Sequence, residues 1–189
     1  PSAANIILEV GNTYAITWTP FALTNVKLSY STNGGASYVL PNGDLIATVP
    51  ATPASYNWTV PDKIGTNLKV KVADANNANV WDDSNNAFTI KGKISLTVPD
   101  AAGLSWPVNS SQTLTWTSTG TYPTVEIHYD RDGDFVTTTA DTFTVGAGTF
   151  TNCAPVSPAI TCNGSATWTI PNAIGTALKV RVRDAGNTS

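Results

Sequence analysis

The chain has 189 residues, of which 41% are apolar and only 12% are charged, and its formal net charge is -3 at pH 7. Charged residues are about half as frequent as in typical soluble domains, so Thr, Ser and Asn must supply much of the polar surface. The sequence has no basic patch of the kind that binds nucleic acid or an anionic membrane, and no apolar run near the ~20 residues of a membrane helix.

Apolar residues alternate with polar ones in four successive segments of the first half, which predicts half-buried β-strands. The residues predicted to face inward are Tyr14, Ile16, Trp18, Val26, Leu28, Tyr30, Tyr56, Trp58, Val60, Leu68, Val70 and Val72. The turn sequences STNGG, LPNGD and VPDKIG separate these segments. Two further strands are predicted at residues 88–90 and 94–98, with only Lys91, Gly92 and Lys93 between them.

The second half repeats the pattern of the first. The stretch YNWTVPDKIGTNLKVKVAD (residues 56–74) matches ATWTIPNAIGTALKVRVRD (residues 166–184), an offset of 110 positions. Earlier in each copy, Trp18 matches Trp116 at an offset of 98 positions. The difference in offset shows that the second copy has gained residues between these two points.

Each copy is about 100 residues long, which is the size of one β-sandwich domain. We therefore predict an all-β chain of two tandem immunoglobulin-like or fibronectin-III-like sandwiches. The first domain should span residues 1–91 and the second residues 92–189, with an insertion at about residues 136–164.

The given sequence begins and ends at different positions of the repeat. Pro1 aligns with Pro99 and Ser189 aligns with Asn79. The first copy is therefore predicted to lack the opening strand found at residues 94–98, and the second to lack the closing segment VWDDSNNAFTI. A window from a longer tandem array is the favoured interpretation. The alternative is that neighbouring subunits supply the missing strands, since an unpaired sheet edge must be covered.

The combination of ITWT, VKLSYSTNGG, YNWTVPDKIGTNLKVKVAD and DDSNNAFTI resembles a known repeat. It is similar to the immunoglobulin-like domain of fungal serine/threonine-rich, glycolipid-anchored cell-wall glycoproteins, and to related repeats in large secreted bacterial surface proteins. The resemblance covers nearly the whole chain, twice. It implies a sandwich without catalytic residues that serves as a surface or spacer module. The Cys-Trp-Cys spacing of antibody domains is absent.

The insertion contains both cysteines, Cys153 and Cys162, in a polar stretch that we interpret as a loop. Two cysteines this close in sequence predict a disulfide and hence an oxidising compartment. Two reduced thiols are the alternative. The loop itself is equally consistent with a partner contact and with a plain spacer.

Two features could support chemistry. Asp130, Asp132 and Asp134 in the stretch DRDGD suggest calcium, a cation that prefers carboxylate ligands. The same stretch aligns with a plain turn in the first copy, and the turn interpretation is favoured. The single histidine, His128, is predicted to face outward from its strand as a surface residue rather than a catalytic base.

Two tryptophans have no match between the copies. Trp81 and Trp106 could stack on a sugar ring, although packing at a seam between the domains is favoured. A further group of residues matches the N-glycosylation sequon, and its members are Asn57, Asn109, Asn163 and Asn187.

The sequence thus predicts a non-enzymatic structural or adhesive module of an extracellular cell-surface repeat protein, part of a stalk, layer or filament. Its partners would be neighbouring repeats or subunits, cell-wall glycans or another surface protein. No cofactor is expected unless the aspartate cluster binds calcium. The alternatives are a carbohydrate- or cell-wall-binding module of a secreted enzyme, and a filament subunit that polymerises by strand exchange.

Overall fold

The computed structural model describes residues 3–20, 22–122, 124–135, 142–156, 159–175 and 177–186, and for residues 142–156, 159 and 160 it describes the backbone only. Every regular element in this part of the chain is a β-strand, as the alternating pattern predicts. No helix long and apolar enough to span a membrane occurs among these residues. The chain divides into two compact units, Pro1–Gly92 and Lys93–Ser189.

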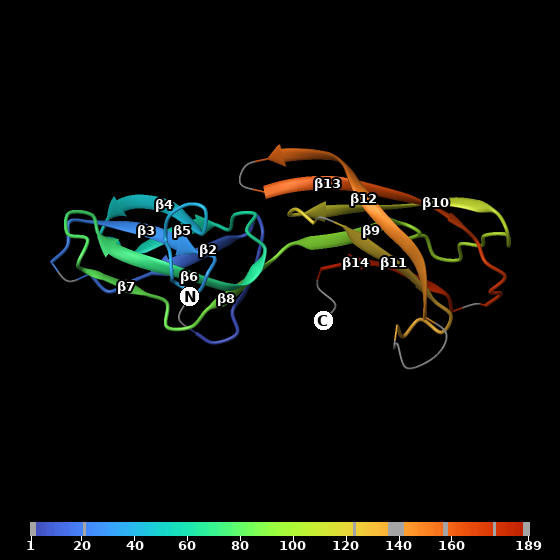
Figure 1. Cartoon of the computed structure of the whole chain (residues 1–189), viewed down its shortest axis with the longest axis horizontal. Helices are drawn as coiled ribbons and strands as arrows, with labels where there is room; N and C mark the ends of the chain where they lie inside the picture. Colours follow the sequence, from blue (N-terminus) through green and yellow to red (C-terminus); the bar gives the residue numbers. More distant parts are fainter. Residues whose placement is uncertain are drawn as a thin grey trace. The chain divides into compact units, whose positions relative to one another are not determined.

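The first unit consists of two facing sheets (Figure 1). Its strands are β1 (Ile7–Glu9), β2 (Thr13–Thr17), β3 (Asn25–Ser31), β4 (Gly43–Pro50), β5 (Ser55–Thr59), β6 (Gly65–Asp74), β7 (Trp81–Asp83) and β8 (Phe88–Lys91). One sheet has the order β1-β8-β6-β3-β4, with β7 paired to β6, and the other is the β2-β5 pair. A short first strand parallel to the last one, opposite a small second sheet, is an immunoglobulin-like arrangement.

Three aromatic rings fill the centre of this first sandwich. The ring of Trp58 stacks on Tyr30 at 6.1 Å and meets Phe88 edge-on at 6.3 Å between centroids. Val26, Leu28, Leu68 and Ile90 are fully buried around them. Strand alternation places these side chains on the inner faces of both sheets, so burial of this cluster is the main stabilising contribution.

The second unit is one continuous sheet that folds over on itself (Figure 1). Its strands are β9 (Lys93–Val98), β10 (Ser111–Thr119), β11 (Val125–Asp130), β12 (Thr142–Val156), β13 (Ala159–Thr169) and β14 (Lys179–Asp184). Their order is β14-β11-β12-β13-β10-β9. The first part of β12 pairs with β11 and the last part with β13, so this strand passes from one layer of the sandwich to the other.

The two copies of the repeat share structural contacts as well as sequence. In the first unit, Gly11 donates its amide to Val60 at 2.9 Å, and in the second Asn109 donates to Ile170 at 2.8 Å. Trp168 occupies the position of Trp58 and packs against Tyr129 at 5.3 Å between centroids. All the residues predicted to face inward are buried or half-buried.

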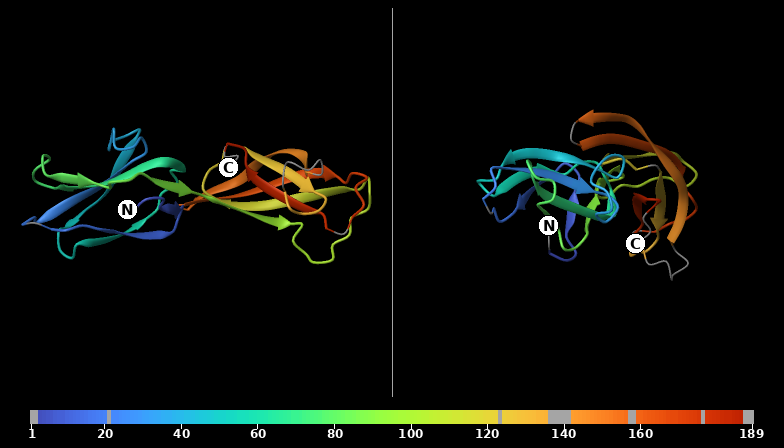
Figure 2. Two further views of the ribbon diagram at one scale, coloured as in Figure 1. Left: turned by 90° about the horizontal axis from the view of Figure 1, so that it is seen from below. Right: turned by 60° about the vertical axis from the view of Figure 1, so that its left-hand side comes forward.

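The interpretation of the insertion as a loop is wrong. Within residues 136–164, the described backbone forms most of the long antiparallel strands β12 and β13, which lie side by side in Figures 1 and 2. The stretch TFTVGAGTFT is rich in Thr, Phe and Val, which favour strands. The extra residues therefore lengthen a hairpin instead of decorating a turn.

In the described residues, the two units differ in which strands lie at the edges of their sheets. In the second unit β9 covers the edge of β10, whereas in the first unit β1 pairs with β8 and nothing lies beside the outer edge of β2. In the first unit β8 pairs with β6. The strand of the second unit that corresponds to β6 is β14, and no described strand pairs with it on that side. Among the described residues, each unit thus has one edge strand, β8 or β9, without a counterpart in the other.

Candidate functional site

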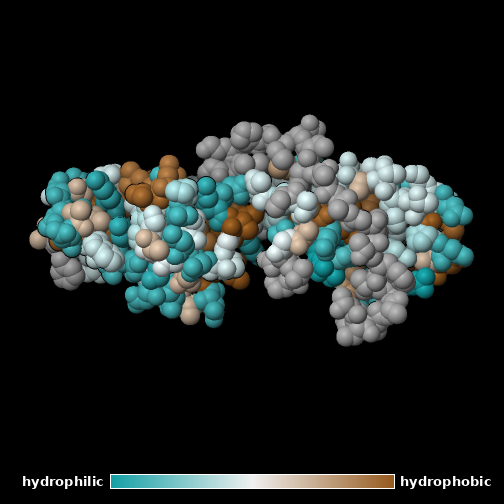
Figure 3. All heavy atoms as spheres, viewed as in Figure 1, coloured by the Kyte–Doolittle hydropathy of each residue, from teal (hydrophilic) through white to brown (hydrophobic). Residues whose placement is uncertain are grey.

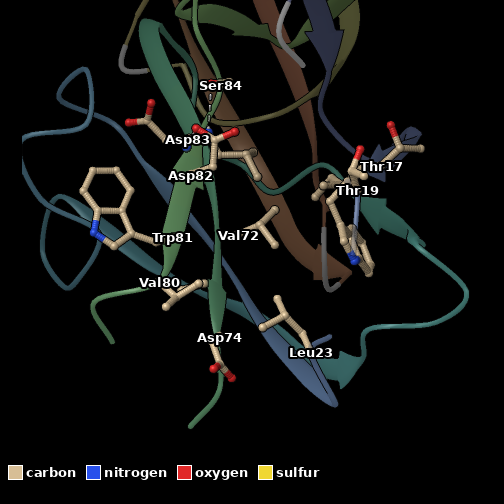
Figure 4. A pocket seen from close by; sticks show the side chains of 14 residues that line it. Thr17, Thr19, Leu23, Val72, Asp74, Val80, Trp81, Asp82, Asp83 and Ser84 are labelled. Atoms are coloured by element: carbon tan, nitrogen blue, oxygen red, sulfur yellow. Dashed lines mark hydrogen bonds between the residues drawn. The ribbon is translucent and has the colours of Figure 1, made fainter. Parts of the chain in front are cut away.

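A groove lies between the two sheets of the first unit (Figure 4). Its volume is about 470 Å³. One wall comes from β2 and the residues that follow it, Thr17 to Thr19, and the other from β6 and β7. The groove exists because the two-stranded β2-β5 sheet does not extend far enough to cover the opposite sheet.

Apolar side chains make up about half of the groove's lining. Its apolar lining residues include Ile16, Leu23, Val70, Val72 and Val80. In Figure 4 the side chains of Val72, Val80 and Leu23 lie toward the middle of the cavity. Apolar surface of this kind gains free energy when another apolar group displaces the water from it.

Polar groups gather at the rim. Asp83 is already engaged, because Tyr38 donates its hydroxyl to Oδ2 at 2.6 Å and Lys69 contacts Oδ1 at 3.2 Å. Burial and this hydrogen bond to Asp83 raise the pKa of Tyr38, so its phenol stays protonated. The carboxylates of Asp74 and Asp82 line the groove as well.

The two unmatched tryptophans belong to different units. Trp81 is 56% exposed, lies on β7 and lines the groove, although Figure 4 shows its indole turned away from Thr17 and Thr19. The ammonium group of Lys71 lies 5.6 Å from the Trp81 ring centroid. Trp106 is half-buried in the second unit, edge-on to Trp168 at 6.1 Å. Trp106 is therefore part of a domain core.

The three aspartates of the DRDGD stretch do converge, with carboxylate oxygens within 4.8 Å of one another. Asp130 is fully buried and accepts the amides of Gly133 at 2.6 Å and Asp132 at 3.1 Å. Gly133 has a φ of +80°, which glycine adopts without strain. These bonds are those of a tight turn, and the calcium site stays a prediction.

Asp130→Ala is expected to lower the free energy of unfolding of the second unit by about 1–3 kcal/mol, because two amides lose their acceptor. Asp130→Asn keeps an oxygen acceptor and should lose less. Urea unfolding followed by near-UV circular dichroism measures both. Equal losses in the two variants would contradict a role for the Asp130 oxygen in holding the turn.

The alternation predicted that His128 is an exposed surface residue, and this prediction is wrong. The residue is only 7% exposed. It lies opposite Arg181 of β14, whose Nε donates to His128 Nδ1 at 3.4 Å, and its Nε2 is 3.6 Å from Glu126. The Arg181 guanidinium also lies over Phe135 at 4.6 Å. Long cross-strand side chains cover this outer face with their stems, an effect that period-2 alternation does not reveal.

Burial lowers the pKa of His128, and the positive charges of Arg183 and Arg181 lower it further, against the opposing effect of Glu126. In the unfolded state His128 therefore binds a proton below about pH 6.5, whereas in the folded state it is protonated only at lower pH. We expect the second unit to lose stability as pH falls below that value. His128→Gln should reduce this loss, measured as the unfolding midpoint at pH 7.5 and pH 5; an unchanged pH dependence would exclude His128 as its source.

Of the two cysteines in the predicted disulfide, only Cys162 has a described side chain. Cys162 is buried on β13 and is not a free thiol. The strand register places residues 152 and 153 in a bulge opposite Cys162, between the pairs Thr151–Asn163 and Ala154–Thr161. The side chain of Cys153 lies outside the described residues, so its pairing with Cys162 stays a prediction.

Three of the sequon asparagines, Asn57, Asn109 and Asn163, are exposed, and Asn187 lies outside the described residues.

Figure 3 shows a compact hydrophobic patch on the first unit among more hydrophilic residues. Exposed aliphatic residues occur at the start of the β4 hairpin, where Val39, Leu40 and Leu45 are 70%, 69% and 53% exposed.

Sequence reasoning missed the groove and the Glu126–Arg183 contact. Arg183 donates to Glu126 from both Nε and Nη2, at 3.0 and 2.8 Å. The missing strand beside β2 was the available signal for the groove, because an open edge between two sheets leaves their inner faces exposed.

Comparisons with known proteins give only weak similarities. No protein-family model matches the chain, and no curated protein is significantly similar to it. The ectodomain of the teleost fish polymeric Ig receptor matches over 95% of this chain and 94% of its own, with 10% identity and a TM-score of 0.32. Dpr2 Ig1-Ig2 in complex with DIP-Theta Ig1-Ig3 matches over 98% of this chain and 58% of its own, with 13% identity and a TM-score of 0.26. At these values neither likeness extends to a function or a partner.

Proposed function

We propose that the chain is a structural and adhesive module of an extracellular cell-surface repeat protein and catalyses no reaction. The observation that carries this proposal is the tandem design. Two sandwiches with matching cores follow each other with only Gly92 between β8 and β9. A linker of one residue limits independent movement of the domains it joins, which suits a stalk, layer or filament.

The resemblance to repeats of fungal cell-wall glycoproteins and bacterial surface proteins supports the same proposal. So do the scarcity of charged residues and the exposed sequons, which suit a glycosylated or densely packed surface. A disulfide between Cys153 and Cys162 would stabilise the hairpin in an oxidising compartment.

Labelling of intact source cells tests the location. Antibodies raised against the chain should stain cells before permeabilisation, and brief protease treatment of the intact cells should remove that staining. A cytoplasmic protein of the same cells serves as the control and should stain only after permeabilisation. Staining that also requires permeabilisation would contradict the proposal.

A carbohydrate-binding module of a secreted enzyme is the second candidate, favoured by the exposed Trp81 at a groove that Thr17 and Asp82 also line. Aromatic rings offer flat apolar faces to sugars, but Lys71 lies over this ring. A glycan array with the wild type and Trp81→Ala tests the idea. Binding that this substitution abolishes would support it, and an array without signal would remove it.

Polymerisation by strand exchange is the remaining candidate. It is favoured by the outer edges of β2 and β14, neither of which has a neighbouring strand in the described residues. A concentration series by analytical ultracentrifugation tests it directly. Filaments or open-ended oligomers are expected if exchange occurs, and a monomer at all concentrations would exclude it.

A further inference from the structure

The outer face of β7, β6 and β3 in the first unit carries two lysines that take no part in the ion pairs of the described residues. The strand register aligns Trp81 of β7, Ala73 of β6 and Lys27 of β3 in one row across this face. Lys71 lies two positions before Ala73 on β6, so its side chain projects from the same face. Neither Lys27 nor Lys71 contacts a carboxylate in the part of the chain that the structure describes.

The acid that lies opposite Lys71 on β7 is already neutralised. This residue is Asp83, whose carboxylate contacts Lys69 at 3.2 Å and accepts the hydroxyl of Tyr38 at 2.6 Å. The ammonium group of Lys71 lies instead 4.5 Å from the ring centroid of Tyr38 and 5.6 Å from that of Trp81. Aromatic faces attract a cation but do not cancel its charge. The positive charge of Lys71 therefore remains available to an anion.

The indole of Trp81 is directed to this outer face and not into the groove. Figure 4 shows it on the opposite side of β7 from the side chains of Val72 and Leu23. It is 56% exposed in spite of its contact with Lys71. Lys27 is exposed at the other end of the row, and the strands that carry Trp81 and Lys27 lie two strand spacings apart, roughly 10 Å. Only the short side chain of Ala73 stands between them.

The second unit has an ion pair at the corresponding place. The offsets of the repeat and the strand register equate Lys27 with Glu126, and Ala73 with Arg183. Glu126 accepts two hydrogen bonds from Arg183, at 3.0 and 2.8 Å, so these two charges neutralise each other. The first unit has a lysine in place of the acid and an alanine in place of the arginine. A neutral pair in one copy thus corresponds to a positive charge beside a small side chain in the other.

We propose that this face binds an acidic sugar residue of a polysaccharide. The apolar face of the pyranose ring stacks on the indole of Trp81, and the acidic group lies over Ala73, between the ammonium groups of Lys71 and Lys27. The recognised chemistry is a pyranose ring with one anionic substituent, a carboxylate or a sulfate. This inference names the ligand of the carbohydrate-binding candidate, on which it rests, and places the site outside the groove.

The test is a glycan array probed with the full chain. The array carries oligosaccharides that contain uronate, sialate or sulfated sugars, beside the same oligosaccharides without the acidic group. Signal is expected from acidic glycans only, and it should weaken at higher ionic strength because salt screens exposed charges. Isothermal titration calorimetry with the strongest acidic binder and its neutral counterpart should show at least about a tenfold difference in Kd.

Variants of the first unit supply the controls. Trp81→Ala and the double variant Lys27→Gln/Lys71→Gln should each weaken binding by about tenfold or more. Lys63→Gln removes a charge from the exposed loop between β5 and β6 and should leave binding unchanged. Lys27→Glu/Ala73→Arg copies the ion pair of the second unit, so it should fold normally and lose binding. Near-UV circular dichroism of each variant checks its fold.

Several results would overturn the proposal. Equal signals from acidic and neutral glycans, lost in Trp81→Ala, would keep the carbohydrate-binding candidate and refute its acidic ligand. Equal binding of polyacrylate, a polyanion without sugar rings, would show a surface that recognises charge alone. Binding of wild-type strength in Lys27→Glu/Ala73→Arg would exclude this face as the site. An array without signal would refute both the acidic ligand and the carbohydrate-binding candidate, while the cell-surface location is decided separately by the labelling test.

Discussion

Trp58→Ala is expected to lower the free energy of unfolding of the first unit by about 3–5 kcal/mol and to leave the second unit folded. The indole is 4% exposed and contacts both Tyr30 and Phe88, so its removal opens a cavity between the two sheets. Guanidinium unfolding followed by tryptophan fluorescence measures the effect. We expect one transition to move to lower denaturant and the other to stay in place.

Trp168→Ala provides the reciprocal experiment. This residue holds the same position in the second unit, against Tyr129 and Trp106. It should shift the other transition by a similar amount. Thr59→Ala, an exposed change next to Trp58, is the control and should alter neither transition by more than about 0.5 kcal/mol. A joint loss of both units in either tryptophan variant would contradict independent cores.

Gly164→Ala is expected to destabilise the second unit by about 1–3 kcal/mol or more, because it overpacks a fully buried site. Gly164 pairs directly with Trp116, and a Cβ at this position would overlap Nε1 and Cε2 of that indole. Trp116 is 1% exposed and has no room to retreat without moving its neighbours. Thermal unfolding of the second unit measures the loss.

The first copy contains a matched control for this substitution. Ala54 holds the position of Gly164, and the first unit accepts its methyl group because Trp18 lies differently, with its indole donating to the carbonyl of Ala51 at 3.1 Å. Ala54→Gly should cost only about 0.5–1 kcal/mol through backbone entropy. A decrease in the free energy of unfolding that is no larger for Gly164→Ala than for Ala54→Gly would contradict the claim that close packing of Trp116 on the β13 backbone requires glycine at position 164.

The sequence predicted those parts of the structure that depend on a residue and its near neighbours. Alternation identified the inward faces of β3 and β6, because a strand with one buried face must alternate. Comparison of the copies located the matching cores around Trp58 and Trp168. The same comparison predicted an unequal set of edge strands, which stays a prediction.

Features that depend on distant partners were not predictable in this way. The insertion became the strands β12 and β13 because its residues pair with each other and with β10 and β11, which composition alone does not show. His128 is buried because Arg181 and Glu126 meet it across and along strands. The groove required both sheets of the first unit to be in place, since its two walls are far apart in sequence.

Single-molecule pulling of the full chain between handles tests the central claim, that two sandwiches in series act as separate structural modules. Full extension of either unit, Pro1–Gly92 or Lys93–Ser189, releases about 300 Å of contour length at ~3.6 Å per residue. We predict two separate unfolding events of about this size, and Trp58→Ala should weaken only one of them. A single event of about twice the length, or extension without any force peak, would contradict the claim.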